Sequence, residues 1–296
     1  MAFGWRCTGV AWPGDGPQLG WSKGAERRVS VLSYGTGLGF RALGERHCVG
    51  ARGNACPLGA VVSVRSTGGR CPECARLDRA HSVAADTLLD DPRTYRVYLA
   101  WFGPGLVKVG ITREERGGAR LREQGAVAYT WLGRGPLMAA RRTEEVLRAA
   151  LGVPDRIPYA KKRGVRSRLP GEQERLAEVV ESYGRAVALQ GRGWPESLEP
   201  LPLEVVDHVG IFGLDRAPAA TRSVSELVDG GVVAGRLVAA AGPDLHLAAG
   251  GDGGVVVLDT RLITGWELSA VDPAAANDVR VPLIDIRGGG VQGGLF

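Results

Sequence analysis

The most regular pattern of hydrophobic and polar positions lies within residues 95–151. Two runs rich in β-branched and aromatic residues, 96–102 and 106–111, are separated by a Gly-Pro-Gly sequence at 103–105. Runs of this kind that flank turn-forming residues are typical of two paired strands. The pattern therefore predicts a β-hairpin.

Helical patterns follow the hairpin. A helix is expected to start at Thr112, because Glu115 follows three residues later as in a capping box. A third short strand is expected over 126–132. Apolar residues recur at helical spacing over 137–151, and Gly152 then provides a stop signal. The expected order is strand, strand, helix, strand, helix.

The rest of the chain divides by composition into a front and a tail, which gives an α+β protein of three domains. Residues 1–92 are expected to hold a β-rich segment, a zinc-ribbon-like cysteine module and a linker helix over 75–89. Residues 93–193 form a small antiparallel sheet flanked by helices and carry a basic loop. Residues 194–296 alternate valine-rich runs with glycine turns, which is typical of a small β-barrel or sandwich.

Charge is distributed unevenly over these segments. Residues 93–193 contain 20 Lys and Arg against 10 Asp and Glu, whereas residues 194–296 contain 6 against 14. A basic segment fits a polyanion such as DNA or RNA, because each neutralised phosphate releases counterions. The alternative is an Arg-rich, solvated surface. The acidic tail is expected to pack against the basic middle.

The chain shows no sign of a membrane segment. The first residues lack the basic and apolar regions of a signal peptide, and no stretch approaches the roughly 20 apolar residues of a membrane span. We expect a cytoplasmic protein without a membrane partner.

Four clustered cysteines predict a metal site. They are Cys48, Cys56, Cys71 and Cys74. The last two have the spacing of a zinc knuckle, and the seven residues between the first two are rich enough in glycine to fold back. Four such cysteines in an intracellular protein favour structural zinc over disulfides.

Other readings of these residues stay open. His47 could replace one of the first two cysteines as a ligand, and His81 is a more distant candidate. Cys71 and Cys74 could instead form a redox dithiol. Cys7 is isolated and is expected to be buried.

Basic and aromatic residues outside these motifs suggest nucleic-acid contacts. A proline-bounded loop carries five cations that could clamp a phosphate backbone or could simply be exposed: Lys161, Lys162, Arg163, Arg166 and Arg168. Trp5, Trp12 and Trp21 could stack on bases, although core packing is the more common role of such residues.

The central segment resembles the GIY-YIG nuclease domain. The two hairpin motifs of that family correspond to VYLA, with Tyr98, and VKVGIT, with Lys108. Arg120 stands where the family has a helix arginine, and Glu144 stands where it has a metal-binding glutamate. Lys108 replaces the tyrosine of the second motif, which is a departure from the family.

The resemblance implies a set of roles. Glu144 would bind Mg²⁺, Arg120 would steady the charged phosphoryl group, and Tyr98 would position or deprotonate the attacking water. Lys108 would contact phosphate. Each residue also has an ordinary alternative: Tyr98 packing on a strand, Arg120 solvated, and Glu144 paired with Arg148 on one helix face.

A closer resemblance, over most of the chain, is to the bacterial domain-of-unknown-function family DUF2797. It rests on the cysteine-rich front, the VKVGIT and QGA sequences and the β-rich tail, and it implies no particular activity. The sequence thus leaves three functions open. They are a Mg²⁺-dependent endonuclease, a non-catalytic protein that binds DNA or RNA, and a zinc-stabilised scaffold for protein interactions.

Overall fold

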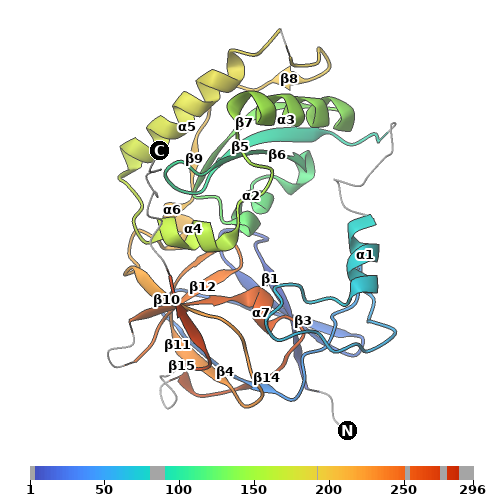
Figure 1. The fold of residues 1–296 in the computed structure, drawn as a ribbon, viewed down its shortest axis with the longest axis vertical. Coiled ribbons are helices and arrows are strands. Elements are labelled where there is room, and N and C mark those ends of the chain that lie inside the picture. Colours follow the sequence, from blue (N-terminus) through green and yellow to red (C-terminus); the bar gives the residue numbers. More distant parts are fainter. Residues whose placement is uncertain (1–3, 81–90, 192, 251–253, 274–278, 287–296) are drawn as a thin grey trace, which may run out of the picture. The chain divides into compact units, whose positions relative to one another are not determined.

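The computed structural model describes residues 4–80, 91–191, 193–250, 254–273 and 279–286. The chain forms two compact units (Figure 1). Residues 1–86 and 211–285 make up one unit, here called the sheet unit. Residues 87–210 and 286–296 make up the other, here called the central unit. The central unit is therefore inserted into the chain of the sheet unit.

The sheet unit is organised around an eleven-stranded sheet. Its strand order is β16-β10-β13-β12-β11-β4-β14-β1-β2-β3, and β15 pairs with β11. The strands before the insertion are β1 (Arg6–Ala11), β2 (Gln18–Lys23), β3 (Glu26–Val31) and β4 (Gly37–Leu43). Those after it are β10 (Ala220–Val224), β11 (Val232–Ala241), β12 (Asp244–Ala248), β13 (Val255–Asp259), β14 (Glu267–Ala270), β15 (Val279–Arg280) and β16 (Leu283–Asp285). The helices are α1 (Pro72–Ala80) and α7 (Thr260–Ile263), and α6 (Val209–Phe212) lies where the chain passes between units.

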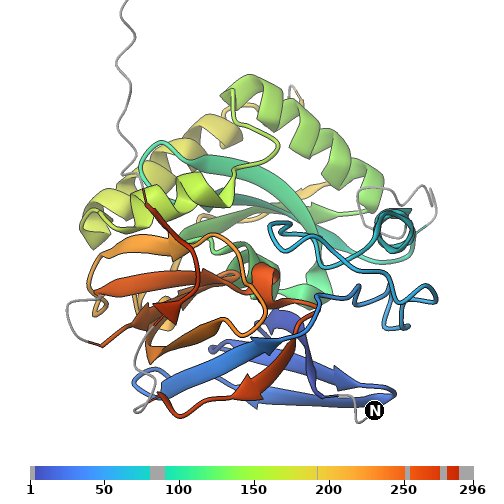
Figure 2. The ribbon, with the colours of Figure 1, turned by 60° about the horizontal axis from the view of Figure 1, so that its bottom comes forward.

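Strands from both ends of the chain pair with each other in this sheet. Strand β4 lies between β11 and β14, and β14 also pairs with β1. Figure 2 shows the blue N-terminal strands among the orange and red C-terminal ones. These pairings differ from the expected division, in which residues 194–296 formed a domain of their own.

The sheet is open along its described edges. Strands β16 and β3 end the strand order and do not pair with each other. The tail therefore does not close into the small barrel expected from its glycine-rich texture. Its apolar strands instead pack into a shared core with the front segment, where Cys7, Trp12, Phe212 and Trp266 are almost fully buried. The Trp12 indole donates a hydrogen bond of 2.9 Å to the carbonyl of Gly242.

The central unit contains the predicted order of strand, strand, helix, strand and helix. These elements are β5 (Tyr95–Trp101), β6 (Val107–Arg113), α2 (Ala119–Gln124), β7 (Ala128–Gly135) and α3 (Leu137–Leu151). They are followed by α4 (Tyr159–Arg166), α5 (Glu172–Val187), β8 (Glu199–Pro200) and β9 (Val206–Asp207). The sheet order is β6-β5-β7-β8, with β9 also on β7. Helix α3 has the predicted bounds and ends at Gly152 in the left-handed region, with a φ of 65°.

Helices cover both faces of this sheet. Alternate residues of β5 point to opposite faces. Tyr98, Ala100 and Phe102 pack with Leu121 of α2 in one cluster, whereas α3 and α5 contact the strands and each other. Figure 1 shows α3 and α5 on the side of the sheet away from α2. The β5–β6 hairpin is thus held between two helical layers.

Two local expectations are wrong. Thr112 is buried within β6 and does not cap a helix; a 3-10 turn over Glu114–Arg116 follows, and α2 starts only at Ala119. Two glycines before Ala119 delay the helix, since glycine disfavours helical backbone.

The predicted basic loop is helix α4. The linker helix was expected over residues 75–89. Helix α1 covers its first part, up to Ala80, and residues 81–89 lie outside the described residues.

Candidate functional site

The four predicted cysteines converge in the sheet unit. One sulfur atom from each of Cys48, Cys56, Cys71 and Cys74 lies within 4.8 Å of the other three. The Sγ atoms of Cys56 and Cys71 are 3.9 Å apart. Tetrahedral zinc with Zn–S bonds of about 2.3 Å places its sulfurs roughly 3.8 Å apart. The cluster therefore has the ligand type and the spacing to hold a metal ion such as zinc.

A tight turn brings the first two cysteines together across their long spacing. Arg52 and Gly53 both have positive φ, at 54° and 80°, and Ala51 pairs with Asn54 around them. Two such residues at the centre of a hairpin are typical of a type I′ turn. Gly50 has a φ of 79°, and a Cβ there would overlap the Asn54 carbonyl oxygen. The glycines between the cysteines thus let the chain reverse.

The second pair is placed by a helix start. Cys71 immediately precedes α1, its carbonyl accepts a hydrogen bond from the Ala75 amide, and Cys74 lies in the first turn. Pro72 occupies the first helical position, where its fixed φ suits the helix. Its missing N–H costs no hydrogen bond there, because the first N–H groups of a helix have no partner within the helix. The sequence Cys-Pro-Glu-Cys therefore presents two thiols from one rigid turn.

The surroundings of the thiols suit thiolate ligands. The amides of Gly50 and Cys71 donate to the Cys48 sulfur, at 3.3 and 3.2 Å. Burial raises the pKa of Cys48 and that of Cys74, the latter to about 12, whereas hydrogen bonding from Ala60 lowers the pKa of Cys56 to about 6. A bound cation stabilises all four as thiolates, so binding releases protons.

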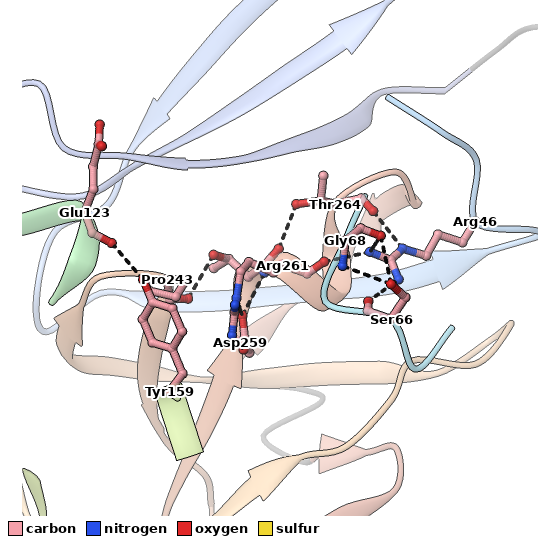
Figure 3. A network of polar contacts seen from close by, with 10 residues as sticks. Arg46, Ser66, Gly68, Glu123, Tyr159, Pro243, Asp259, Arg261 and Thr264 are labelled. Carbon is pink, nitrogen blue, oxygen red and sulfur yellow. Dashed lines mark hydrogen bonds and ion pairs between the residues drawn. The ribbon is translucent and has the colours of Figure 1, made fainter. Parts of the chain in front are cut away.

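Arg46 ties the cysteine module to the sheet (Figure 3). Its side chain is 1% exposed and donates to carbonyl oxygens on both sides. On the module side the acceptors are Ser63, Ser66 and Gly68; on the sheet side they are Arg261 and Thr264. Burial lowers the pKa of Arg46, and nearby Asp259 opposes that shift. This contact depends on folding, and no sequence pattern indicated it.

The other cysteine and histidine candidates lie outside the cluster. Nδ1 of His47 is 2.9 Å from the Gly59 carbonyl. Among the residues that the structure describes, the group of three or more side chains close enough to hold an ion consists of the four thiols. Cys7 is fully buried in the sheet core, as expected. His81 lies outside the described residues.

In the central unit, the predicted Tyr98 lies on β5 opposite Gly110 of β6. A Cβ at Gly110 would overlap the Tyr98 phenol. The Tyr98 ring therefore lies over β6 at Gly110, in the space that a larger side chain would fill. Tyr98 is 2% exposed. Its oxygen accepts a hydrogen bond of 2.9 Å from the side chain of Gln124, and burial raises its pKa. The phenol therefore keeps its proton at neutral pH.

Lys108 and Glu144 are electrostatic neighbours. Burial lowers the pKa of Lys108 and raises that of Glu144, and each charge partly offsets the shift of the other. The positive charge of Arg120 lowers the pKa of both Tyr98 and Lys108. It is also 3.8 Å from Glu123 and is 46% exposed. Lys108 and Tyr98 thus each interact electrostatically with both Arg120 and Glu144.

Further charged groups affect the pKa values of Lys108 and Glu144. Arg141 and Arg148 lower the pKa of Glu144, and Arg156 lowers that of Lys108. Arg148 forms an ion pair of 3.2 Å with Asp155, the next acidic group in the neighbourhood. Asp155 also raises the pKa of Glu144, so this carboxylate lies among charges of both signs. We call Lys108, Arg120 and Glu144 the central cluster.

The five predicted phosphate-binding cations separate into two groups. Lys162 and Arg166 are only 4% and 5% exposed, and they donate to the carbonyls of Gln124 and Gly125 at 2.9 and 3.0 Å. The Lys162 ammonium also lies over the rings of Phe102 and Tyr159. These two stabilise the end of α2 and cannot contact phosphate, which corrects the prediction. Lys161 and Arg168 are exposed and Arg163 is half-buried.

No sequence pattern singled out Gln124 as a site residue. Its side-chain amide donates a hydrogen bond to the Tyr98 phenol, and its backbone carbonyl accepts a hydrogen bond from the Lys162 ammonium. Glutamine before a helix-ending glycine is common, so the pattern indicates only a helix end. The contact to Tyr98 arises because α2 packs on the face of β5 that carries that ring.

Comparisons with known proteins point to one family. A sequence model described as "Protein of unknown function (DUF2797)" matches residues 35–268. No curated protein and no solved structure matches the chain. Among the helices that the structure describes, none is long and apolar enough to cross a membrane.

Proposed function

The chain belongs to the DUF2797 family, and from its own residues we propose that it binds nucleic acid, with the central cluster contacting the phosphodiester backbone. The observation that carries this proposal is the excess of Lys and Arg in residues 93–193, 20 against 10 Asp and Glu, together with the position of Lys108, which interacts electrostatically with Arg120 and Arg156 as well as with the carboxylates of Glu144 and Asp155. An ammonium and planar guanidinium groups are the usual partners of phosphate oxygens.

A second candidate is Mg²⁺-dependent cleavage at the same place, and the resemblance to GIY-YIG nucleases suggests it. Glu144 is the residue that would hold Mg²⁺, which supplies an activated water and charge stabilisation when bound. Its carboxylate offers the oxygen ligands that this hard cation prefers, and helix α3 holds it at a half-buried position.

The roles of the chain's own residues follow from their environments. Lys108 and Arg120 would hold the phosphoryl oxygens. Tyr98, whose pKa burial raises, would act as a hydrogen-bond donor that orients the water. It is a poor base, because its oxygen already accepts from Gln124. Tyr98 is thus better suited to positioning the water than to deprotonating it.

In the sheet unit we propose a structural zinc ion on the four cysteines. Four protein ligands leave no open position for a substrate. The ion would fix the loop between Cys48 and Cys74, which Arg46 fastens to the sheet.

Binding is tested by fluorescence anisotropy with single-stranded, duplex and branched DNA and RNA at several salt concentrations. The Lys108→Ala/Arg120→Ala variant should bind more weakly, and its salt slope should fall by about 1 for each lost phosphate contact. Arg142→Ala, an exposed arginine on α3, is the matched control. Unchanged affinity and slope in the double variant would reject the proposed site.

Cleavage is tested on the same substrates with and without Mg²⁺ or Mn²⁺. Metal-dependent cutting that Glu144→Gln abolishes while binding persists would establish the nuclease. Binding without cutting by either protein would leave the non-catalytic function. In both cases Glu144→Gln should bind at least as tightly as the wild type, because it removes a negative charge from the phosphate site.

A further inference from the structure

The structure separates the three N-terminal tryptophans into two kinds. Trp12 is 1% exposed and packs edge-on against Phe212, with ring centroids 5.1 Å apart. Trp5 and Trp21 are half-buried at the β1–β3 end of the sheet. Only the latter two present indole surface to solvent. Trp21 packs partly against the sheet core, but both rings keep part of their surface exposed.

An arginine lies against both half-buried rings. The guanidinium carbon of Arg28 is 4.0 Å from the ring centroid of Trp5 and 5.7 Å from that of Trp21. Trp21 and Arg28 are directly opposite across β2 and β3. The Trp21 indole donates a hydrogen bond of 3.0 Å to Ser30, which fixes the ring. Two flat rings and a flat cation are thus held at one place on the sheet unit.

The β2–β3 hairpin beside the rings is basic, whereas the Glu267 side chain lies near Gly4, next to Trp5. Lys23, Arg27 and Arg28 are exposed on the β2–β3 hairpin, against a single acidic residue, Glu26. The Arg27 side chain also donates to the carbonyl of Gly53 at 3.3 Å, in the turn of the cysteine module. The exposed Arg52 adjoins that glycine. The rings are therefore bordered by cations from two elements of the same unit.

We propose that Trp5, Trp21 and Arg28 form a stacking platform for single-stranded nucleic acid. Unpaired bases stack on aromatic and guanidinium planes, and cations beside the platform contact the phosphates between them. Duplex bases are already stacked on each other, so they cannot present their faces in this way. The inference rests on the proposed nucleic-acid function but uses residues of the other unit.

The test compares binding of a fluorescent single-stranded oligonucleotide and its duplex. Trp21→Leu and Trp5→Leu should each weaken single-strand binding by about tenfold, because each removes a surface on which a base stacks. Duplex affinity should stay unchanged. Trp21→Phe keeps a ring and should retain most of the affinity. Arg236→Ala removes another exposed arginine of the sheet unit and serves as the control.

The Lys108→Ala/Arg120→Ala background separates this inference from the proposed function. Quenching of tryptophan fluorescence by single strands should persist in that background and disappear when Trp5 and Trp21 are also replaced. If the platform variants, shown to be folded by their melting curves, bind single strands like the wild type, the platform is rejected while the central cluster stands. Absence of binding to any nucleic acid by the wild type would reject both.

Discussion

The side-chain amide of Gln124 donates a hydrogen bond of 2.9 Å to the phenol oxygen of Tyr98, and both residues are buried. The contact joins α2 to β5. It also leaves the phenol proton free to be donated. The two side chains therefore satisfy each other within the core while fixing the orientation of a candidate site residue.

Loss of this hydrogen bond should destabilise the protein. Gln124→Leu and Tyr98→Phe should each cost about 1–3 kcal/mol of unfolding free energy, because the remaining partner is buried without a hydrogen bond. The double variant should cost less than the sum of the two single variants. Urea denaturation of the four proteins gives the coupling energy, and additive single effects would contradict the predicted contact.

Metal content should depend on the four clustered cysteines. The purified protein should hold about one zinc ion per chain, whereas Cys74→Ser should lose most of it. Cys7→Ala should retain the ion, because Cys7 lies in the sheet core. Atomic emission on dialysed protein measures the content. Chelation should lower the melting temperature of the wild type and leave that of Cys74→Ser nearly unchanged.

Two glycines of the cysteine loop should respond differently to alanine. Gly53→Ala meets no atom within 4 Å and should cost only about 1–2 kcal/mol for its left-handed backbone. Gly50→Ala also overlaps the Asn54 carbonyl, so it should shift the turn and lower zinc occupancy. Zinc titration with a chromogenic chelator compares the two. Equal occupancy would show that the turn is not what aligns the cysteines.

Adjacent lysines of α4 should differ in stability effect. Lys162→Ala removes a buried ammonium that contacts two rings and a carbonyl, and it should cost about 2–4 kcal/mol. Lys161→Ala, at an exposed position, should stay within about 0.5 kcal/mol of the wild type. Chemical denaturation distinguishes them. A similar cost for both would mean that Lys162 is not buried in solution.

Acid should weaken the protein partly through Asp91. Hydrogen bonds from Arg93, with a further one from Tyr95, hold the pKa of the Asp91 carboxyl well below its usual range. A lowered folded-state pKa gives stability that is present above the unfolded-state pKa, near 4, and is lost as pH falls below it. The advantage of wild type over Asp91→Asn should therefore shrink between about pH 5 and pH 2. A constant difference in unfolding free energy over that range would refute this role.

Local patterns predicted the central unit well. Helix α3 is set by the spacing of its apolar residues and by Gly152, and both signals act within a few residues. The cysteine cluster was also predictable, because glycine and proline determine how its loop turns. By contrast, the burial of Lys162 depends on Phe102 and Tyr159, which lie on separate elements. A run of cations looks the same in the sequence whether it is solvated or covered.

The organisation of the sheet unit was not predictable from local signals. Strand β4 reads as an ordinary short strand, and nothing in its residues indicates that β11 and β14 are its neighbours. Such pairing is decided by packing of the whole core, in which front and tail share apolar residues. The same limit applies to Arg46, whose acceptors become neighbours only in the folded chain.

The insertion of the central unit affects the order of folding during synthesis. Arg46 and its acceptor Thr264 are separated by 218 positions, so a ribosome that adds 5–20 residues per second needs roughly ten to forty seconds to supply the second after the first. Strands β1 to β3 can pair with one another early, but β4 must wait through that interval for β11 and β14, and β1 must wait for β14. The central unit emerges meanwhile and contains all the strands of its own sheet. Nascent chains should therefore acquire protease resistance first in the middle, and the N-terminal strands are the part that chaperones would need to protect.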